Sequence, residues 1–133
     1  MDCKVLIVDD ETRYCELLRR VLERDGFTVG VADQGAAAME RLLHERVDLL
    51  ITDLDMPGLT GLDLTELAQR LPRTPRVLVI TAQKAMLEGA ARRLRDAQCL
   101  LKPFSLEDFR AKVALLTGQW REATRDAGPR TQD

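Results

Sequence analysis

The stretch LIVDDETRYCELLRR, residues 6–20, joins a short apolar run to two adjacent carboxylates and then to a helical pattern. The first three residues are typical of a buried strand, and apolar side chains recur at one-face helical spacing from Tyr14 to Leu22. Asp9 and Asp10 therefore lie between a strand and a helix. Two like charges side by side repel each other unless a cation, a hydrogen-bond donor or water takes up their charge, so the pair indicates half of a metal site.

The same alternation continues along the chain. Five runs are predicted to be strands: residues 3–8, 27–31, 48–52, 76–80 and 98–101. The first, third and fourth are continuously apolar, as buried parallel strands are. Capping-box spacing marks two helix starts, at Thr60 with Asp63 and at Ser105 with Asp108, and Gly118 is predicted to end the last helix. Five such units predict an α/β fold, a five-stranded parallel sheet doubly wound as (βα)5.

Composition narrows the classes of protein. A chain of 133 residues suits one domain, which we place at residues 2–117, with residues 118–133 as a polar tail or truncated linker. The 20 basic and 22 acidic side chains give a net charge of -2, which offers no electrostatic case for binding nucleic acid or a membrane. Three cysteines without metal-site spacing, and no signal peptide or long apolar span, favour a reduced, cytoplasmic protein.

Ligands of doubly wound sheets bind beyond the carboxyl ends of the strands, and here those ends are polar. Asp9 and Asp10 end the first strand, Asp53 the third, Thr81 the fourth and Lys102 the fifth. Three carboxylates with open positions suit Mg²⁺ and a phosphate better than Zn²⁺. A carboxylate can accept a phosphoryl group when a metal and an ammonium neutralise the phosphoryl oxygens, and Asp53 on the central strand is the best candidate.

Four segments in this order, VLIVDDE, DLLITDLDMPGLTGLDL, VLVITA and CLLKPFSLEDF, resemble the receiver domain of two-component response regulators over roughly residues 2–117. The resemblance implies a flavodoxin-like fold and a signalling phosphoprotein rather than an enzyme, although such a domain assists its own phosphorylation and dephosphorylation. It implies phosphorylation of Asp53 by a histidine kinase, a phosphotransfer protein of a phosphorelay or a small phosphodonor. The Mg²⁺ cofactor would be held by Asp10 and Asp53 directly, by Asp9 through water and by the backbone carbonyl of Asp55.

The resemblance also implies a switch. Lys102 would pair with the phosphoryl group through a cis Lys102–Pro103 peptide, and the Thr81 hydroxyl would swing toward that group. The surface of the fourth helix, fifth strand and fifth helix would change, which allows a homodimer there. One departure is Cys99, which stands where receivers usually carry the Tyr or Phe that partners the threonine. A thiol is small and fits either setting, so we expect Cys99 to be passive.

Two alternatives come from other classes of protein. Asp53-Leu54-Asp55 fits the DxD of haloacid dehalogenase-like phosphatases, but there the DxD normally precedes the acidic pair, and here Asp9 and Asp10 come first. A flavodoxin-like cofactor binder is weaker still, because the carboxylates would repel a phosphate unless metal intervenes. The sequence leaves open the cognate kinase and whether the domain acts alone or within a longer chain.

Overall fold

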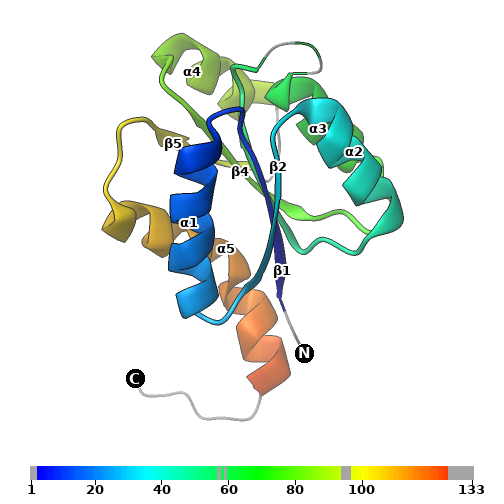
Figure 1. The fold of residues 1–133 in the computed structure, drawn as a ribbon. Helices are drawn as coiled ribbons and strands as arrows, with labels where there is room; N and C mark the ends of the chain where they lie inside the picture. The colour runs from blue at the N-terminus through cyan, green and yellow to red at the C-terminus, as the bar shows by residue number, and fades with distance from the viewer. Residues whose placement is uncertain (1–2, 57, 59, 94–96, 126–133) are drawn as a thin grey trace.

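Five strands and five helices alternate along the described part of the chain, which in this computed structural model comprises residues 3–56, 58, 60–93 and 97–125. Each predicted strand is present, with both ends within one residue of the predicted bounds. No helix within these residues is long and apolar enough to cross a membrane. The elements in order are β1 (Lys4–Val8), α1 (Thr12–Arg24), β2 (Thr28–Ala32), α2 (Gly35–His44), β3 (Leu49–Asp53), α3 (Gly61–Ala68), β4 (Arg76–Thr81), α4 (Lys84–Arg93), β5 (Ala97–Leu101) and α5 (Leu106–Arg125) (Figure 1).

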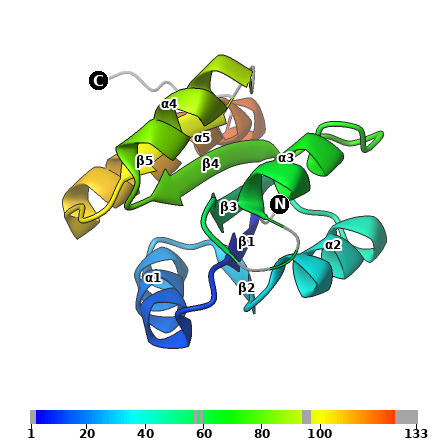
Figure 2. The ribbon, with the colours of Figure 1, turned by 90° about the horizontal axis from the view of Figure 1, so that it is seen from above.

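All neighbouring strands are parallel, and the sheet has the order β2-β1-β3-β4-β5. The predicted five-stranded, doubly wound fold is therefore confirmed. Helices α1 and α5 supply the core of one face of the sheet, and α2, α3 and α4 supply the core of the other. Figure 2 shows α1 on the opposite side of the sheet from α2 and α3. The winding direction reverses between β1 and β3, which is where such a fold opens a crevice for a ligand.

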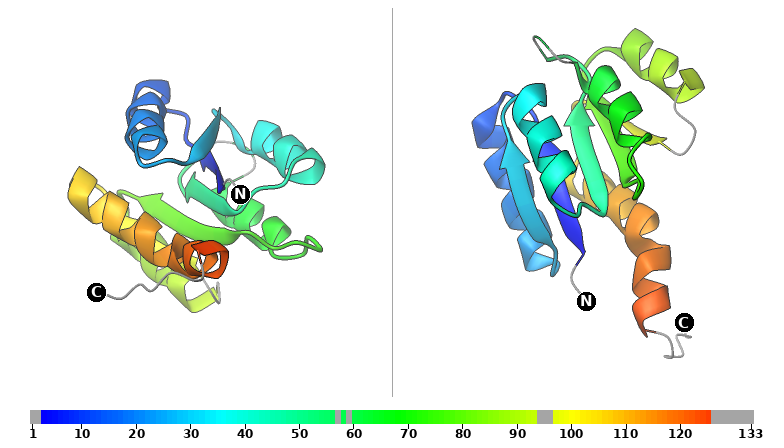
Figure 3. Two further views of the ribbon diagram at one scale, coloured as in Figure 1. Left: turned by 90° about the horizontal axis from the view of Figure 1, so that it is seen from below. Right: turned by 90° about the vertical axis from the view of Figure 1, so that its right-hand side faces the viewer.

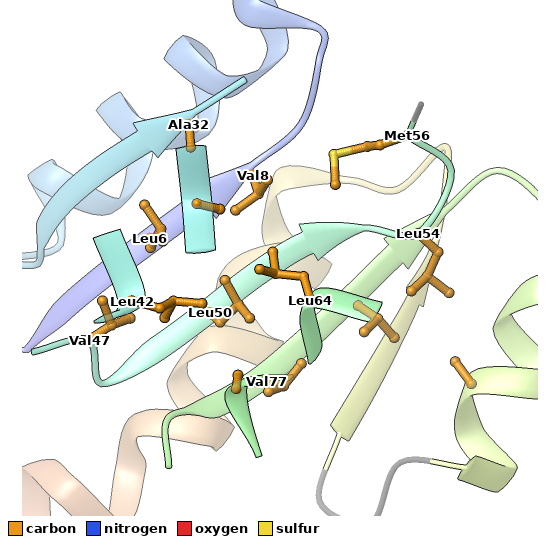
Figure 4. Packing of buried hydrophobic residues seen from close by; sticks show 14 residues of the cluster. Leu6, Val8, Ala32, Leu42, Val47, Leu50, Leu54, Met56, Leu64 and Val77 are labelled. Atoms are coloured by element: carbon orange, nitrogen blue, oxygen red, sulfur yellow. The ribbon is translucent and has the colours of Figure 1, made fainter. Parts of the chain in front are cut away.

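Alternate residues of the central strands point into two hydrophobic clusters, one on each face, as the pleat of a strand requires. Figure 4 shows one of them, in which Leu6 and Val8 of β1 and Leu50 of β3 face Leu42 of α2 and Leu64 of α3. Every residue of β3 is buried. Because a fully buried leucine contributes roughly 2 kcal/mol, these clusters hold firmly the strands whose ends carry the polar residues.

The predicted helix starts are present. Thr60 and Asp63 form a reciprocal capping box at the start of α3, with the Asp63 N–H donating to Thr60 Oγ1 at 3.2 Å. At α5 the Asp108 N–H donates to Ser105 Oγ at 3.0 Å. These bonds satisfy backbone donors that the first turn of a helix would otherwise leave without partners, so each helix begins directly after its loop.

The prediction that Gly118 ends the last helix is wrong, because α5 continues through it to Arg125. Glycine inside a helix costs only about 1 kcal/mol relative to alanine, and residues 119–125 contain no proline to stop the helix. Residues 118–125 of the predicted tail therefore lie in α5, and residues 126–133 lie outside the described residues. The last turns of α5 project beyond the end of the sheet where β1 begins (Figure 3).

Candidate functional site

The carboxyl ends of β1, β3 and β5 carry polar side chains that meet at one point. Asp9 follows β1 directly, Asp53 is the last residue of β3, and Lys102 follows β5. Strand β4 lies between β3 and β5, so the lysine side chain has to reach across the end of β4 to meet the carboxylates. The Lys102 N–H donates to the backbone oxygen of Thr81 at 2.8 Å, which anchors the start of this reach on β4.

The ammonium of Lys102 bridges the two carboxylates. Its Nζ donates to Asp53 Oδ2 at 2.9 Å and to Asp9 Oδ2 at 3.0 Å, and it lies 3.6 Å from Oε1 of Glu11. The peptide bond between Lys102 and Pro103 is cis. Burial by itself would lower the pKa of the lysine, but the hydrogen bonds and charges of Asp53 and Asp9 outweigh burial and raise that pKa above its usual value. The amine therefore stays an ammonium at neutral pH.

Asp9 is fully buried, and each of its carboxylate oxygens has a donor. Oδ1 accepts from the Glu11 N–H at 3.0 Å, while Oδ2 is the oxygen that Lys102 contacts. Burial raises the pKa of Asp9, the charge of Asp53 raises it further, and the bonds from the Glu11 backbone and Lys102 oppose the rise. The site thus keeps two buried acids close together by sharing one cation between them.

Asp53 is also held at both oxygens, and only 6 % of its surface is exposed. Oδ1 accepts from the Asp55 N–H at 2.9 Å, and Oδ2 accepts from Lys102. Gly61, the first residue of α3, lies directly against the Asp53 backbone, because a Cβ there would come within 2.7 Å of its carbonyl carbon. The start of α3 and the end of β3 therefore fix the position of this carboxylate together.

The predicted metal ligands differ in their exposure and in their contacts. Asp10 and Asp55 are exposed, and Asp55 Oδ2 accepts from Gln83 Nε2 at 2.9 Å. Within the described residues, no group of three or more Asp, Glu, His or Cys side chains stands ready to hold a metal ion. The donor chemistry nevertheless fits Mg²⁺: Asp9 and Asp53 carry two charges against the single charge of Lys102, and their oxygens are the hard ligands that Mg²⁺ prefers.

The predicted switch residue Thr81 and the atypical residue Cys99, which was expected to be passive, lie on neighbouring strands. Thr81, the last residue of β4, is fully buried, and its Oγ1 accepts from the Gln83 N–H at 3.2 Å. Cys99 on β5 is half-buried against the cluster that also contains Ala90 of α4. Burial raises the pKa of the Cys99 thiol, so the thiol stays protonated at neutral pH. The half-buried, protonated thiol of Cys99 therefore gives no support to a role as a reactive cysteine.

Sequence reasoning missed two residues at this site, namely Glu11 and Tyr14. The Glu11 carboxylate approaches Lys102, and the Tyr14 ring centroid lies 5.0 Å from Nζ of the same lysine. Their spacing offered a signal, since Glu11 directly follows the acidic pair and Tyr14 comes about one helical turn later, but only the orientation of α1 brings them to the lysine.

Comparisons with known proteins agree with this geometry. The response regulator receiver domain family matches residues 5–114. The response regulator MprA of Mycobacterium ulcerans (strain Agy99) is 35 % identical over 117 residues, which are 87 % of this chain and 50 % of that protein. MprA of Mycobacterium sp. (strain KMS) is 32 % identical over 130 residues, 97 % of this chain and 55 % of the relative. The chain thus spans about half the length of these curated relatives.

Solved structures share the fold. The chemotaxis response regulator CheY4 of Vibrio cholerae superposes with a TM-score of 0.79 at 24 % identity, covering 87 % of this chain and 99 % of that one. The response regulator TrrA of Thermotoga maritima, solved in complex with Mg²⁺-BeF, has a TM-score of 0.77 at 26 % identity, covering 86 % of this chain and 98 % of that one.

Proposed function

The chain belongs to the family of response regulator receiver domains of two-component systems, and from this premise we propose that Asp53 is its phosphoacceptor. The phosphoryl group would come from a histidine kinase, a phosphotransfer protein or a small phosphodonor such as acetyl phosphate. The observation that carries the proposal is the Lys102 ammonium, which reaches across β4 to bond Asp53 at 2.9 Å and Asp9 at 3.0 Å. An ammonium at a buried, strand-end carboxylate is the arrangement that transfer of a phosphoryl group to that carboxylate needs.

In the proposed transfer, an oxygen of Asp53 attacks phosphorus in line with the leaving group. The new O–P bond forms as the bond from phosphorus to the donor breaks, and the donor nitrogen or oxygen keeps that electron pair. Lys102 then moves its hydrogen bond from Asp53 Oδ2 to a phosphoryl oxygen, while Asp9 still accepts from the same ammonium. The Asp55 N–H at Oδ1 holds the carboxylate still during the attack.

Mg²⁺ is the cofactor that this donor set supports. Asp10 and Asp53 would hold it directly, Asp9 through water, and Asp55 through its backbone carbonyl. When bound, Mg²⁺ would neutralise the charge on the phosphoryl oxygens that a single ammonium cannot neutralise by itself. The buried pair Asp9 and Asp53 already places one more negative than positive charge at this point, which favours a cation there.

The proposed output is a change at the surface formed by α4, β5 and α5. Thr81 would turn its hydroxyl toward the phosphoryl group and leave the Gln83 N–H that it now accepts from. Leu101 of β5 and both Leu106 and Leu115 of α5 are exposed on these elements. The partner that this surface meets would be another protein or a second copy of this chain. Cys99 stays passive in this scheme. The cytoplasmic location expected from the sequence stays a prediction.

The test is covalent labelling with radioactive acetyl phosphate and Mg²⁺. Wild-type protein should take up one hydroxylamine-labile label per chain, Asp53→Asn should take up none, and removal of the divalent cation with a chelator should also abolish labelling. Asp55→Asn is the matched control, because it keeps the backbone carbonyl and leaves Asp53 unchanged. It should label like wild type, whereas a phosphatase with Asp55 as general acid would lose activity. Labelling of Asp53→Asn at the wild-type rate would disprove the assignment.

A further inference from the structure

An aromatic ring lies beside the lysine at the centre of the site. Tyr14, in the first turn of α1, places its ring centroid 5.0 Å from Lys102 Nζ, which is within the range of a cation–π contact. The lysine side chain keeps only 17 % of its surface exposed, so water weakens this contact little. Burial is also the largest cause that raises the pKa of Tyr14, to about 12, so the ring carries no charge at neutral pH.

The position of the ring is set by a chain of aromatic contacts that ends in the core. The Tyr14 and Phe104 centroids are 5.9 Å apart at 57°, and the Phe104 and Phe109 centroids are 5.8 Å apart at 19°. Phe109 of α5 is fully buried. Phe104 lies just after Pro103, in the loop that also orients Lys102. The three rings therefore connect α1, the β5–α5 loop and α5, and the first of them contacts the lysine.

Under the proposed function Lys102 has to exchange one hydrogen-bond acceptor for another, and a carboxylate neighbour alone would assist this exchange poorly. If Asp53 is phosphorylated, the ammonium has to move from Asp53 Oδ2 to a phosphoryl oxygen without leaving the site. A carboxylate binds an ammonium at one place and competes with the phosphoryl group, as Glu11 at 3.6 Å can do. A neutral ring attracts the cation over a broad area and brings no charge that would repel the phosphoryl group.

We propose that Tyr14 is a positioning residue for Lys102: its ring face keeps the ammonium at the strand ends while the hydrogen bond passes from Asp53 to the phosphoryl oxygen. This inference rests on the proposed phosphorylation of Asp53. It predicts that the ring face matters and that the phenol hydroxyl does not. Phenylalanine should therefore replace tyrosine at this position, while an aliphatic side chain should not.

The experiment compares Tyr14→Phe, Tyr14→Leu and wild type by the rate of acetyl phosphate labelling at saturating donor with Mg²⁺. Tyr14→Phe should label within about twofold of wild type, and Tyr14→Leu about tenfold more slowly, the factor that a partly desolvated cation–π contact supports. Val31→Ala is the control for lost packing, because Val31 packs against the same hydrophobic cluster from the edge strand β2. It should label at the wild-type rate. If Tyr14→Leu does not fold, Tyr14→Met provides an unbranched replacement without a ring.

A second readout does not depend on labelling. The Lys102 side-chain protons next to the ring should show upfield ring-current shifts in NMR spectra of wild type and Tyr14→Phe, and these shifts should vanish in Tyr14→Leu or Tyr14→Met. The inference would be overturned if a folded Tyr14→Leu or Tyr14→Met labelled at the wild-type rate, or if Tyr14→Phe labelled as slowly as Tyr14→Leu. Either result would leave the phosphoacceptor assignment in place. A wild-type protein that takes up no label at Asp53 would overturn both.

Discussion

Replacing Gly61 by alanine should displace the backbone of Asp53, the proposed phosphoacceptor, without changing any charged group. Gly61 begins α3 and lies against the end of β3. A Cβ at this position would overlap the backbone oxygen of Asp53 and would lie 2.7 Å from its carbonyl carbon and 2.8 Å from Cα of Leu54. All three neighbours are backbone atoms, so no rotation of a side chain can relieve the overlap.

The size of the effect follows from this geometry. To bring the new carbon to the ~3.5 Å of ordinary carbon contacts, α3 and β3 would have to separate by about 1 Å. Overpacking in a core costs typically 1–3 kcal/mol, and we expect about 3 kcal/mol here because the backbone itself must move. In a domain of this size that is a fall in melting temperature of roughly 10 °C. The same displacement would move Asp53 away from the ammonium of Lys102, now at 2.9 Å from Oδ2.

Two measurements test this prediction together. Urea denaturation should show the loss of stability, and acetyl phosphate labelling of the folded fraction should slow, because the carboxylate no longer lies in place. Gly118→Ala is the matched control: Gly118 lies inside α5 with open space around its Cα, so alanine there should stabilise the protein by about 0.5–1 kcal/mol and leave labelling unchanged. A Gly61→Ala protein with wild-type stability and wild-type labelling would show that the contact with the Asp53 backbone is unimportant.

Three further predictions concern the charges and the switch. Burial is the main cause of the raised pKa of Asp9, and the charge of Asp53 raises this pKa further. Asp53→Asn removes that charge and should therefore lower the pKa of Asp9. A ¹³C NMR titration that shows no fall in this pKa would contradict the prediction. Lys102→Met should destabilise the fold by about 2 kcal/mol near neutral pH, because Asp9 loses its buried cation. An acid whose folded-state pKa is raised destabilises the fold at pH values above that pKa. The stability lost in Lys102→Met should therefore shrink as the pH falls through the pKa of Asp9. Urea titrations at several pH values that show a constant or growing loss would contradict this. Thr81→Ala should leave Asp53 labelled but abolish the phosphorylation-dependent self-association that sedimentation measures. Cys99→Ala should leave this self-association intact. If both variants lost self-association to the same degree, Cys99 would not be passive.

Much of the fold and part of the site could be predicted from sequence because both depend on apolar strands, of which the central strand β3 is buried along its whole length. A continuously apolar run such as residues 49–51 has one stable place, the middle of a sheet with helices on both faces. The polar residue at the end of such a run must then lie at the edge where ligands bind, so Asp9, Asp53 and Lys102 could be placed together before any coordinates were known.

The features that could not be predicted depend on weak or long-range preferences. Gly118 was expected to stop a helix, but the small helical penalty of glycine is overridden when the residues on both sides favour the helix. The approach of Tyr14 to Lys102 depends on how α1 lies across the sheet and on the rings of Phe104 and Phe109, which come from the other end of the chain. Helical periodicity places Tyr14 on an apolar face and says nothing of which cation it meets there.

The charges at the strand ends explain how one site can serve both stability and phosphorylation under the proposed function. With Asp9 and Asp53 buried, Lys102 stabilises the unphosphorylated domain, since two neighbouring buried carboxylates without a cation would be costly. A phosphoryl group on Asp53 replaces one negative charge by about two, which a single ammonium balances less well. A divalent cation held with Asp10 would restore the balance, and a shift of Lys102 along the Tyr14 ring would let the same lysine serve both states. The strength of the Lys102 contacts is therefore limited in two ways. If these contacts were too weak, the buried acids would destabilise the fold, and if they were too strong, the lysine would not leave Asp53.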